Sequence, residues 1–456
     1  QLLRDQYDPD ALKGATRIAK GLNASPGAAV GQVVFDADDA VEWVEQGKSV
    51  VLVRVETSPD DFHGMAIAEG ILTARGGATS HAAVVARQIG KPCVAGCAEL
   101  TVDYATKTAT SVNTGLTFKE GDWISLDGGT GEVFEGALGT VSADYDEQDD
   151  LKTVLGWADE IRRMEVWTNA DKPEEAERAR AYGAQGIGLC RTEHMFREGD
   201  RLEIVRGAIL VSGAAMRARA KVESGAALDA EEQAAIDTFD SAMAKLEALQ
   251  QGDFEGIFEA MKGLPVVVRL IDPPLHEFLP NLEETLVEVT KAGDAATEEQ
   301  KQLLAIVQSM HEMNPMLGLR GVRLGLMIPD FVKIQTRAIL NAQVAVNKRG
   351  GDAIAKIMIP LVGHVNELSR VRGLLEAEAD QIAEASGVTL DYKFGTMIEI
   401  PRGALTADEI AKEASFFSFG TNDLTQMAFG YSRDDAEGGF LLKYVEEKVL
   451  PFNPFQ

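Results

Sequence analysis

The sequence predicts an α/β protein of two unequal units, a compact β/α domain followed by an incomplete (β/α)8 barrel. Short apolar runs alternate with helical segments along the 456 residues, as parallel β/α architectures require. The runs in the second unit end in charged or polar residues, which is typical of strands whose carboxyl ends form an active-site face. The expected divisions are a connecting segment at 1–20, the first domain at 21–140, a linker with a helix at 141–164 and the barrel at 165–456.

The first unit shows short strand and helix signals. A turn at 23–27 leads into a strand, and a Thr-, Val- and Gly-rich segment up to residue 136 predicts further strands and hairpins. Apolar runs and helical periodicity predict strands at 50–54 and 70–74 and helices at 59–69 and 80–89. Gly90 and Pro92 stop the second helix. The acidic stretch at 143–150 then reads as a solvated linker.

Seven strand-like runs are visible in the second unit, one fewer than a closed barrel needs. They lie at 165–169, 186–191, 265–271, 316–320, 355–362, 395–400 and 416–420. A long Ala/Glu-rich helical insertion at 198–262 is predicted to elaborate the barrel rim. Because strand carboxyl ends meet on one face of such a barrel, the polar residues that follow the runs should converge there.

Bulk composition excludes several classes of partner. The net charge is −28, from 72 acidic and 44 basic residues, which opposes binding to nucleic acid or to an anionic membrane. No apolar run approaches the roughly 20 residues that span a bilayer. Three cysteines are too few and too unevenly spread for a disulfide framework, so a soluble protein of the reducing cytoplasm is expected. The first residues carry neither an initiator Met nor a signal-peptide pattern and read as an internal starting point.

His81 stands at the start of a helix behind the paired glycines Gly76 and Gly77. Glycines let the backbone approach an anion, Thr79 or Ser80 can cap the first turn, and the free amides of the turn favour negative charge. The positive helix end also disfavours an imidazolium, so His81 is predicted to be a neutral nucleophile suited to carry a phosphoryl group. The alternative is a histidine that merely starts a surface helix.

Arginines at three separate strand ends are candidates for anion binding. Guanidinium groups of Arg191, Arg269 and Arg320 could surround one tetrahedral oxyanion and neutralise the charge of a phosphoryl transfer. Each could instead be a solvated residue or an ion-pair partner. In so acidic a chain, three arginines aimed at one face favour the binding role.

Two carboxylates end neighbouring strands near the carboxyl terminus. Glu399 and Asp423 are hard oxygen ligands, so we expect them to bind Mg²⁺ or Mn²⁺ and leave the other positions to water and substrate. The alternative makes Glu399 a salt-bridge partner and Asp423 a helix cap. No Walker-type phosphate loop occurs, so no adenine-nucleotide site is visible in the chain.

The motifs together resemble the pyruvate, phosphate dikinase family of phosphoenolpyruvate-utilising enzymes over essentially the whole chain. The phosphohistidine motif of that family is similar to Gly76–Arg87, and its preceding segments resemble Ser25-Pro26-Gly27 and Glu56-Thr57-Ser58-Pro59. Two longer segments, 188–196 and 270–280, look like the dikinases in particular.

By this resemblance the first domain is a swivelling phosphohistidine domain, and Nε2 of His81 carries the phosphoryl group. The implied reaction interconverts ATP, pyruvate and phosphate with AMP, phosphoenolpyruvate and diphosphate. ATP and phosphate would bind a family domain that lies outside this chain, as does the final barrel strand with its proton-donating cysteine. Thr79 matches a position at which plant members are regulated, and a homodimer through the barrel is a family expectation.

The resemblance also assigns the substrate site in the barrel. The three arginines would hold the phosphoryl group of phosphoenolpyruvate, the two carboxylates would bind Mg²⁺, and a loop would bind the other substrate oxygens. The residues so assigned are Arg191, Arg269, Arg320, Glu399, Gly420, Thr421, Asn422 and Asp423. Pyruvate, water dikinase and a phosphorelay protein like enzyme I of the sugar phosphotransferase system are the alternatives.

Overall fold

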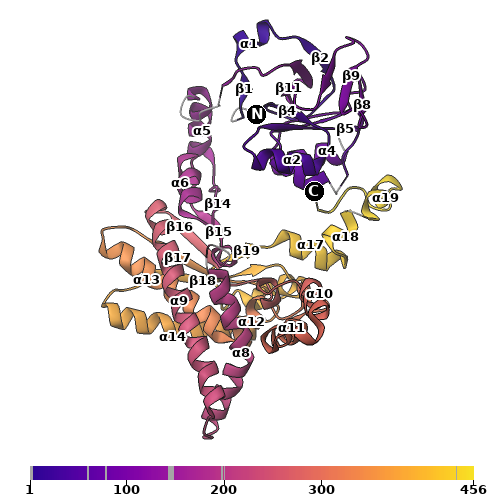
Figure 1. Ribbon diagram of the computed structural model, residues 1–456. Helices are drawn as coiled ribbons and strands as arrows, with labels where there is room; N and C mark the ends of the chain where they lie inside the picture. The colour runs from indigo at the N-terminus through magenta and orange to yellow at the C-terminus, as the bar shows by residue number, and fades with distance from the viewer. Residues whose placement is uncertain are drawn as a thin grey trace. The chain divides into compact units, whose positions relative to one another are not determined.

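The computed structural model folds into two compact units, Gln1–Arg162 and Arg163–Gln456. It describes residues 4–58, 61–77, 80–141, 148–196, 199, 201–437 and 439–455. Both units combine strands with helices, as Figure 1 shows. The predicted α/β class is therefore confirmed.

A mixed sheet of eight strands forms the centre of the first unit, in the order β2-β12-β11-β4-β5-β6-β7-β3. Strands β4 to β7 are mutually parallel, and the remaining pairs are antiparallel. Their bounds are β2 Arg17–Lys20, β3 Leu22–Ser25, β4 Ala28–Val34, β5 Val50–Arg54, β6 Gly70–Thr73, β7 Cys93–Ala95, β11 Trp123–Asp127 and β12 Glu132–Glu135. The strands expected at 50–54 and 70–74 are confirmed.

Three helices cover this sheet, α2 (Ala37–Glu45), α3 (Phe62–Ile67) and α4 (His81–Ile89). The helix expected at 80–89 is confirmed, whereas α3 is shorter than the helix expected at 59–69, of which residues 59 and 60 lie outside the described ranges. Smaller elements complete the unit: β1 Gln6–Tyr7, α1 Pro9–Lys13, β8 Leu100–Asp103, β9 Thr108–Ser111, β10 Thr117–Lys119, β13 Thr140–Val141 and α5 Asp149–Ile161.

The continuous apolar run of β5 is explained by burial on both faces of the sheet. Val51 and Val53 pack into one core cluster, together with Leu100 and Phe118. On the opposite face, the intervening residues of β5 pack against residues of α2, α3 and α4, namely Ala40, Met65, Ala82, Ala83 and Ala86. A strand covered on both faces shows no polar alternation.

Six parallel strands form the sheet of the second unit, and their spatial order follows the chain. They are β14 Thr168–Asn169, β15 Ile187–Arg191, β16 Pro265–Arg269, β17 Ile354–Ile359, β18 Tyr392–Ile398 and β19 Phe417–Phe419. This sheet is part of a barrel, as the sequence predicts.

The prediction of a strand at 316–320 is wrong. Residues Pro315–Leu317 form the 3-10 turn η5, and β16 pairs directly with β17. Leu317 and Leu319 are 57% and 38% exposed, so this apolar run is not a buried strand. Pro315 and Gly318 favour the observed turn instead. As a result Arg320 reaches the strand-end face from a loop.

The insertion expected to be helical is confirmed and consists of α8 (Arg201–Glu223) and α9 (Ala230–Ala260). The two helices run side by side as a long hairpin (Figure 1). A capping box of Asp229 and Glu232 starts α9. Phe239, Phe254 and Phe258 anchor α9 in the main core of the unit.

The other helices of the second unit cover the sheet or follow its strands. They are α6 Pro173–Ala181, α7 Thr192–Met195, η3 Leu275–Phe278, α10 Leu282–Ala292, η4 Gly293–Ala295, α11 Glu298–Met310, α12 Gly321–Met327, α13 Pro329–Lys348, α14 Val365–Ser386, α15 Pro401–Leu405, α16 Ala407–Ile410, α17 Thr421–Phe429, α18 Arg433–Glu437 and α19 Leu441–Glu446. Within the described ranges, no helix combines the length and apolar character needed to cross a bilayer.

Candidate functional site

The segment before His81 is a glycine turn that ends in a helix cap. Gly76 has a φ of 115°, which disfavours a side chain, and the Ser80 amide donates to the Gly77 carbonyl over 3.0 Å. Ser80 is the N-cap of α4, and its Oγ accepts from the Ala83 amide at 3.5 Å. Gly90 ends the helix in the left-handed conformation. His81 is thus the first residue of α4, while its side chain, Ala78 and Thr79 lie outside what is described.

In the second unit, two of the predicted arginines converge on one buried carboxylate. Oδ2 of Asp272 lies 3.0 Å from Nη1 of Arg269 and 2.7 Å from Nη2 of Arg320. Arg269 also pairs with the buried Glu193. Nη1 of Arg320 in turn lies 3.6 Å from Oδ1 of Asp423. One oxygen of Asp272 therefore fixes the spacing of two guanidinium groups.

A glycine allows Arg320 to reach this position. Gly321 has a φ of 56°, and a Cβ there would lie 2.7 Å from Cβ of Leu361. The Gly321 amide donates to the Asp272 carbonyl over 2.9 Å. Only a residue without a side chain fits against the Pro360–Leu361 backbone. Gly321 therefore lets the loop before α12 pass close to this backbone, which places Arg320 beside Asp272.

Glu399 is fully buried at the end of β18, beside the same cluster. Its Oε1 accepts from the Leu361 amide at 2.5 Å. Burial raises the pKa of Glu399 to about 8, and the charges of Asp272 and Asp423 add to the rise. Burial also raises the pKa of Asp423, against the lowering effect of Arg320. Three carboxylates, of Glu399, Asp272 and Asp423, are thus crowded around a largely buried site.

The carboxylates suit a hard divalent cation. Oε2 of Glu399 and Oδ1 of Asp272 are buried and have no hydrogen-bond partner among the described residues. A Cβ on Gly420 would lie 2.6 Å from Oε2 of Glu399, so glycine leaves space beside that oxygen. Within the described ranges, no group of three or more His, Cys, Asp or Glu side chains is arranged to hold a metal ion. The unpartnered oxygen of Glu399, with the carboxylate of Asp423 nearby, is compatible with a hard divalent cation that takes few protein oxygens and completes its shell with water and substrate.

The remaining predicted residues lie at the same strand ends with other contacts. Arg191 is the register neighbour of Arg269, and its Nη1 lies 3.5 Å from Oδ2 of Asp171. Gly420 caps α17, and Thr421 and Asn422 are exposed on its first turn. The only described side-chain bond of Asn422 is a long one, 3.5 Å from Arg433. The structure thus joins Arg269, Arg320, Glu399 and Asp423, and places Arg191, Gly420, Thr421 and Asn422 around them.

The pairing roles of Asp272 and Glu193 are not predicted from the sequence. Both lie directly after strand ends, in Arg269-Leu270-Ile271-Asp272 and Arg191-Thr192-Glu193. That position was a usable signal, because charged groups at neighbouring parallel strand ends lie together. What could not be predicted is that these acids pair with the arginines of adjacent elements.

Comparisons with known proteins agree with this arrangement of the chain. Residues 145–455 match the model of the family described as PEP-utilising enzyme, PEP-binding domain. Residues 46–131 match the model of PEP-utilising enzyme, mobile domain. The chain belongs to the PEP-utilising enzyme family. The match of the PEP-binding domain includes the charged cluster, and that of the mobile domain includes His81.

Curated members of the PEP-utilising enzyme family are similar over the whole chain. Pyruvate, phosphate dikinase of Flaveria pringlei is 50% identical over 460 residues, which cover 100% of this chain and 45% of the relative. Pyruvate, phosphate dikinase of Clostridium symbiosum is 46% identical over 456 residues, 100% of this chain and 49% of the relative. The resemblance stated from the motifs is confirmed. The chain spans about half the length of these relatives.

Proposed function

We propose that this chain carries the phosphohistidine and phosphoenolpyruvate-binding parts of a pyruvate, phosphate dikinase. The reaction is the interconversion of ATP, pyruvate and phosphate with AMP, phosphoenolpyruvate and diphosphate. The observation that carries the proposal is the convergence of Arg269, Arg320, Glu399 and Asp423 at one strand-end face. Similarity to the Flaveria and Clostridium dikinases over the whole chain supports it.

The arginines bind and orient the phosphoryl group. Guanidinium forks match phosphate oxygens and neutralise the charge that spreads over them during transfer. Asp272 holds Arg269 and Arg320 at a fixed spacing, so little reorganisation is needed when substrate binds. Arg191, at the adjacent strand end, would close the site on a further side.

Glu399 and Asp423 would hold Mg²⁺ beside the substrate oxygens. When bound, the ion supplies positive charge that stabilises the enolate and phosphoryl oxygens. Gly420, Thr421 and Asn422 would bind the remaining oxygens of the substrate. Burial of Glu399 keeps bulk water away from this side of the site.

His81 is the proposed phosphoryl acceptor. The bond from phosphorus to the enol oxygen breaks as a bond to Nε2 of His81 forms, and the enolate of pyruvate is released from phosphorus. The first unit is then the swivelling domain, and ATP and phosphate react with it through parts of the protein outside this chain. Cys190 is not a candidate proton donor, because it is fully buried and precedes Arg191 in β15, so its side chain points to the opposite face of the strand.

The experiment is labelling of the full-length protein that contains this chain with [³²P]phosphoenolpyruvate and Mg²⁺. We expect acid-labile label on His81 and none in His81→Ala. His63→Ala is the matched control, since His63 lies in the same unit and pairs only with the exposed Asp38 among its described contacts; it should label normally. Label that persists in His81→Ala contradicts the proposal.

The identity of the second product separates the two dikinases. Diphosphate release during ATP-dependent synthesis of phosphoenolpyruvate supports the proposal, whereas free phosphate alone indicates a pyruvate, water dikinase. Failure of ATP to load the full-length protein would favour the phosphorelay alternative. Location in the cytoplasm and a homodimer through the barrel stay predictions.

A further inference from the structure

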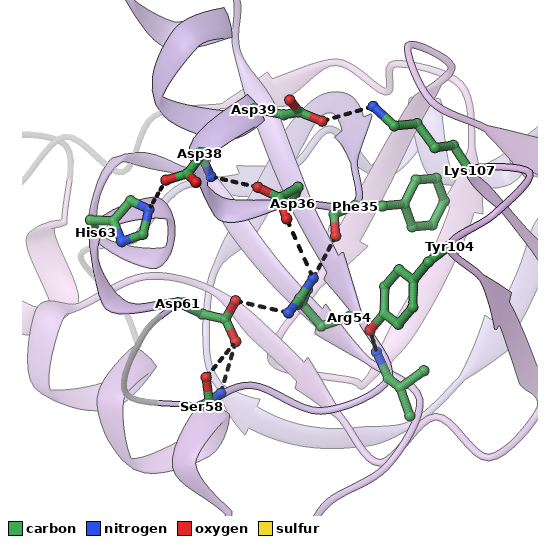
Figure 2. A network of polar contacts seen from close by, with 11 residues as sticks. Phe35, Asp36, Asp38, Asp39, Arg54, Ser58, Asp61, His63, Tyr104 and Lys107 are labelled. Atoms are coloured by element: carbon green, nitrogen blue, oxygen red, sulfur yellow. Dashed lines mark hydrogen bonds and ion pairs between the residues drawn. The ribbon is translucent and has the colours of Figure 1, made fainter.

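A polar network surrounds Arg54 in the first unit (Figure 2). Arg54 ends β5, and its guanidinium lies at the centre of the network in Figure 2. Nη1 donates to the Phe35 carbonyl over 2.8 Å, and Nη2 lies 3.1 Å from Oδ1 of Asp61. Asp61 is 5% exposed, so this ion pair is shielded from solvent. Arg54 thereby joins the end of β4 to the start of α3.

Asp61 also fastens the loop that follows β5. Its Oδ2 accepts from the Ser58 amide at 2.8 Å and from the Ser58 hydroxyl at 3.2 Å. The carboxylate therefore bonds to Arg54 through one oxygen and to Ser58 through the other. Ser58 belongs to the Glu56-Thr57-Ser58-Pro59 segment, and removal of Asp61 would release both of its partners.

Tyr104 holds the same loop from a different element. It lies between β8 and β9, and its ring centroid is 5.1 Å from Cζ of Arg54, a cation–π distance. The Tyr104 hydroxyl accepts a hydrogen bond from the Val55 amide at 2.7 Å. One side chain thus contacts both Arg54 and the backbone of the next residue.

Two backbone hydrogen bonds connect Arg54 and Val55 to the segment before His81. The Ala74 amide donates to the Arg54 carbonyl over 3.0 Å, and the Arg75 amide donates to the Val55 carbonyl over 2.7 Å. Arg75 directly precedes the Gly76-Gly77 turn that leads to α4. A shift of Val55 therefore displaces the start of the phosphohistidine segment.

We propose that Arg54, Asp61 and Tyr104 are positioning residues that set the loop before His81 for phosphoryl transfer. This inference rests on the proposed function of His81. None of the three contacts the described part of the glycine turn with its side chain, so they act through Val55, Ser58 and the backbone bonds to Ala74 and Arg75. Displacement of a reacting group by about 1 Å can slow a reaction by about 10²-fold, which sets the scale of the expected effect.

The test uses Tyr104→Phe, Arg54→Gln and Arg54→Lys in the full-length protein. Tyr104→Phe removes only the hydroxyl that accepts from Val55 and leaves the ring beside Arg54. Lys107→Gln is the matched control: it breaks ion pairs of 2.8 Å to Asp39 and to Glu120 on the same face but has no described bond to either loop. The readouts are the single-turnover rate of His81 labelling by [³²P]phosphoenolpyruvate, the KM for phosphoenolpyruvate and the melting temperature.

We expect Tyr104→Phe and Arg54→Gln to label more slowly, by up to about 10²-fold, with unchanged KM and, for Tyr104→Phe, an unchanged melting temperature. Arg54→Lys should recover part of the rate, and Lys107→Gln should match the wild type. Wild-type labelling rates in both Tyr104→Phe and Arg54→Gln overturn the inference, as does equal slowing by Lys107→Gln. A His81→Ala protein that still labels overturns the proposed function instead, so the two failures are distinguishable.

Discussion

The two units place their candidate residues at the carboxyl ends of parallel strands but fix them by opposite means. In the first unit, the segment before His81 is held by backbone bonds, a glycine turn and a serine cap. In the second, buried charges such as Arg269, Asp272 and Arg320 hold one another. A charge-compensated site should fail when one member is removed, because the partners are left buried and unpaired. A segment that is held by backbone hydrogen bonds should lose less stability when one side chain is replaced.

The largest effect is expected for Arg269→Gln. The substitution leaves the buried Glu193 without its described cation and Asp272 with Arg320 alone, so the free energy of unfolding should fall by about 3–5 kcal/mol. Denaturant unfolding measures it, together with loss of phosphoenolpyruvate-dependent labelling. Arg349→Gln removes partly exposed ion pairs between the end of α13 and α9 and serves as the control. An equally stable Arg269→Gln protein would contradict the interdependence of the charged cluster.

A smaller effect is expected for Gly420→Ala. The added Cβ would lie 2.6 Å from Oε2 and 2.7 Å from Cβ of Glu399, and overpacking of this kind costs about 1–3 kcal/mol. Mg²⁺ affinity, measured by calorimetry, should fall as well because the carboxylate must move. Gly373→Ala in α14 meets no atom within 4 Å and should be neutral or stabilising. Unchanged Mg²⁺ affinity in Gly420→Ala would contradict the assignment of Glu399 as a metal ligand.

The raised pKa of Glu399 predicts a pH dependence in the second unit. The folded-state pKa of about 8 exceeds the ordinary value of 4.5, so the folded protein binds the proton more tightly. The stabilisation is complete below about pH 4.5 and is lost as the pH rises through about 8. Without Mg²⁺, thermal melting should fall over that window, and Glu399→Gln should flatten the fall. A wild-type slope identical to that of Glu399→Gln would show that Glu399 does not titrate in this range.

The smallest effect is expected in the first unit for Ser80→Ala. The cap bond to the Ala83 amide is long, at 3.5 Å, so its loss should cost about 0.5 kcal/mol, the low end of capping energies. Chemical denaturation of the first unit measures the change. A loss above about 2 kcal/mol would exceed the usual capping range and would mean that Ser80 does more than cap α4.

The sequence predicted those elements whose signals are local. Strand β5 is a continuous apolar run, and α4 ends at Gly90, which takes the left-handed conformation that stops helices. The run 316–320 looked equally apolar, but Pro315 and Gly318 turn the chain and expose Leu317. Periodicity alone does not separate a short buried strand from an exposed apolar loop.

For the candidate site, the position of residues at strand ends could be predicted from the sequence, whereas the ion pairs between them could not. Arg269, Glu399 and Asp423 could be predicted because polar residues after parallel strands meet on one face. The bond of Asp272 to both Arg269 and Arg320 depends on the conformation of Gly321 against Leu361, which the sequence does not display. The contact of Arg54 with Tyr104 likewise joins elements that are distant in the chain.

The most direct test of the central claim is ³¹P NMR of the full-length protein, with ¹⁵N-labelled histidine, after addition of phosphoenolpyruvate and Mg²⁺. We expect a phosphoramidate signal coupled to Nε2 of His81 that disappears in His81→Ala and is strongly reduced in Arg269→Gln. A phosphoryl group on another residue, or a signal unaffected by either substitution, would contradict it.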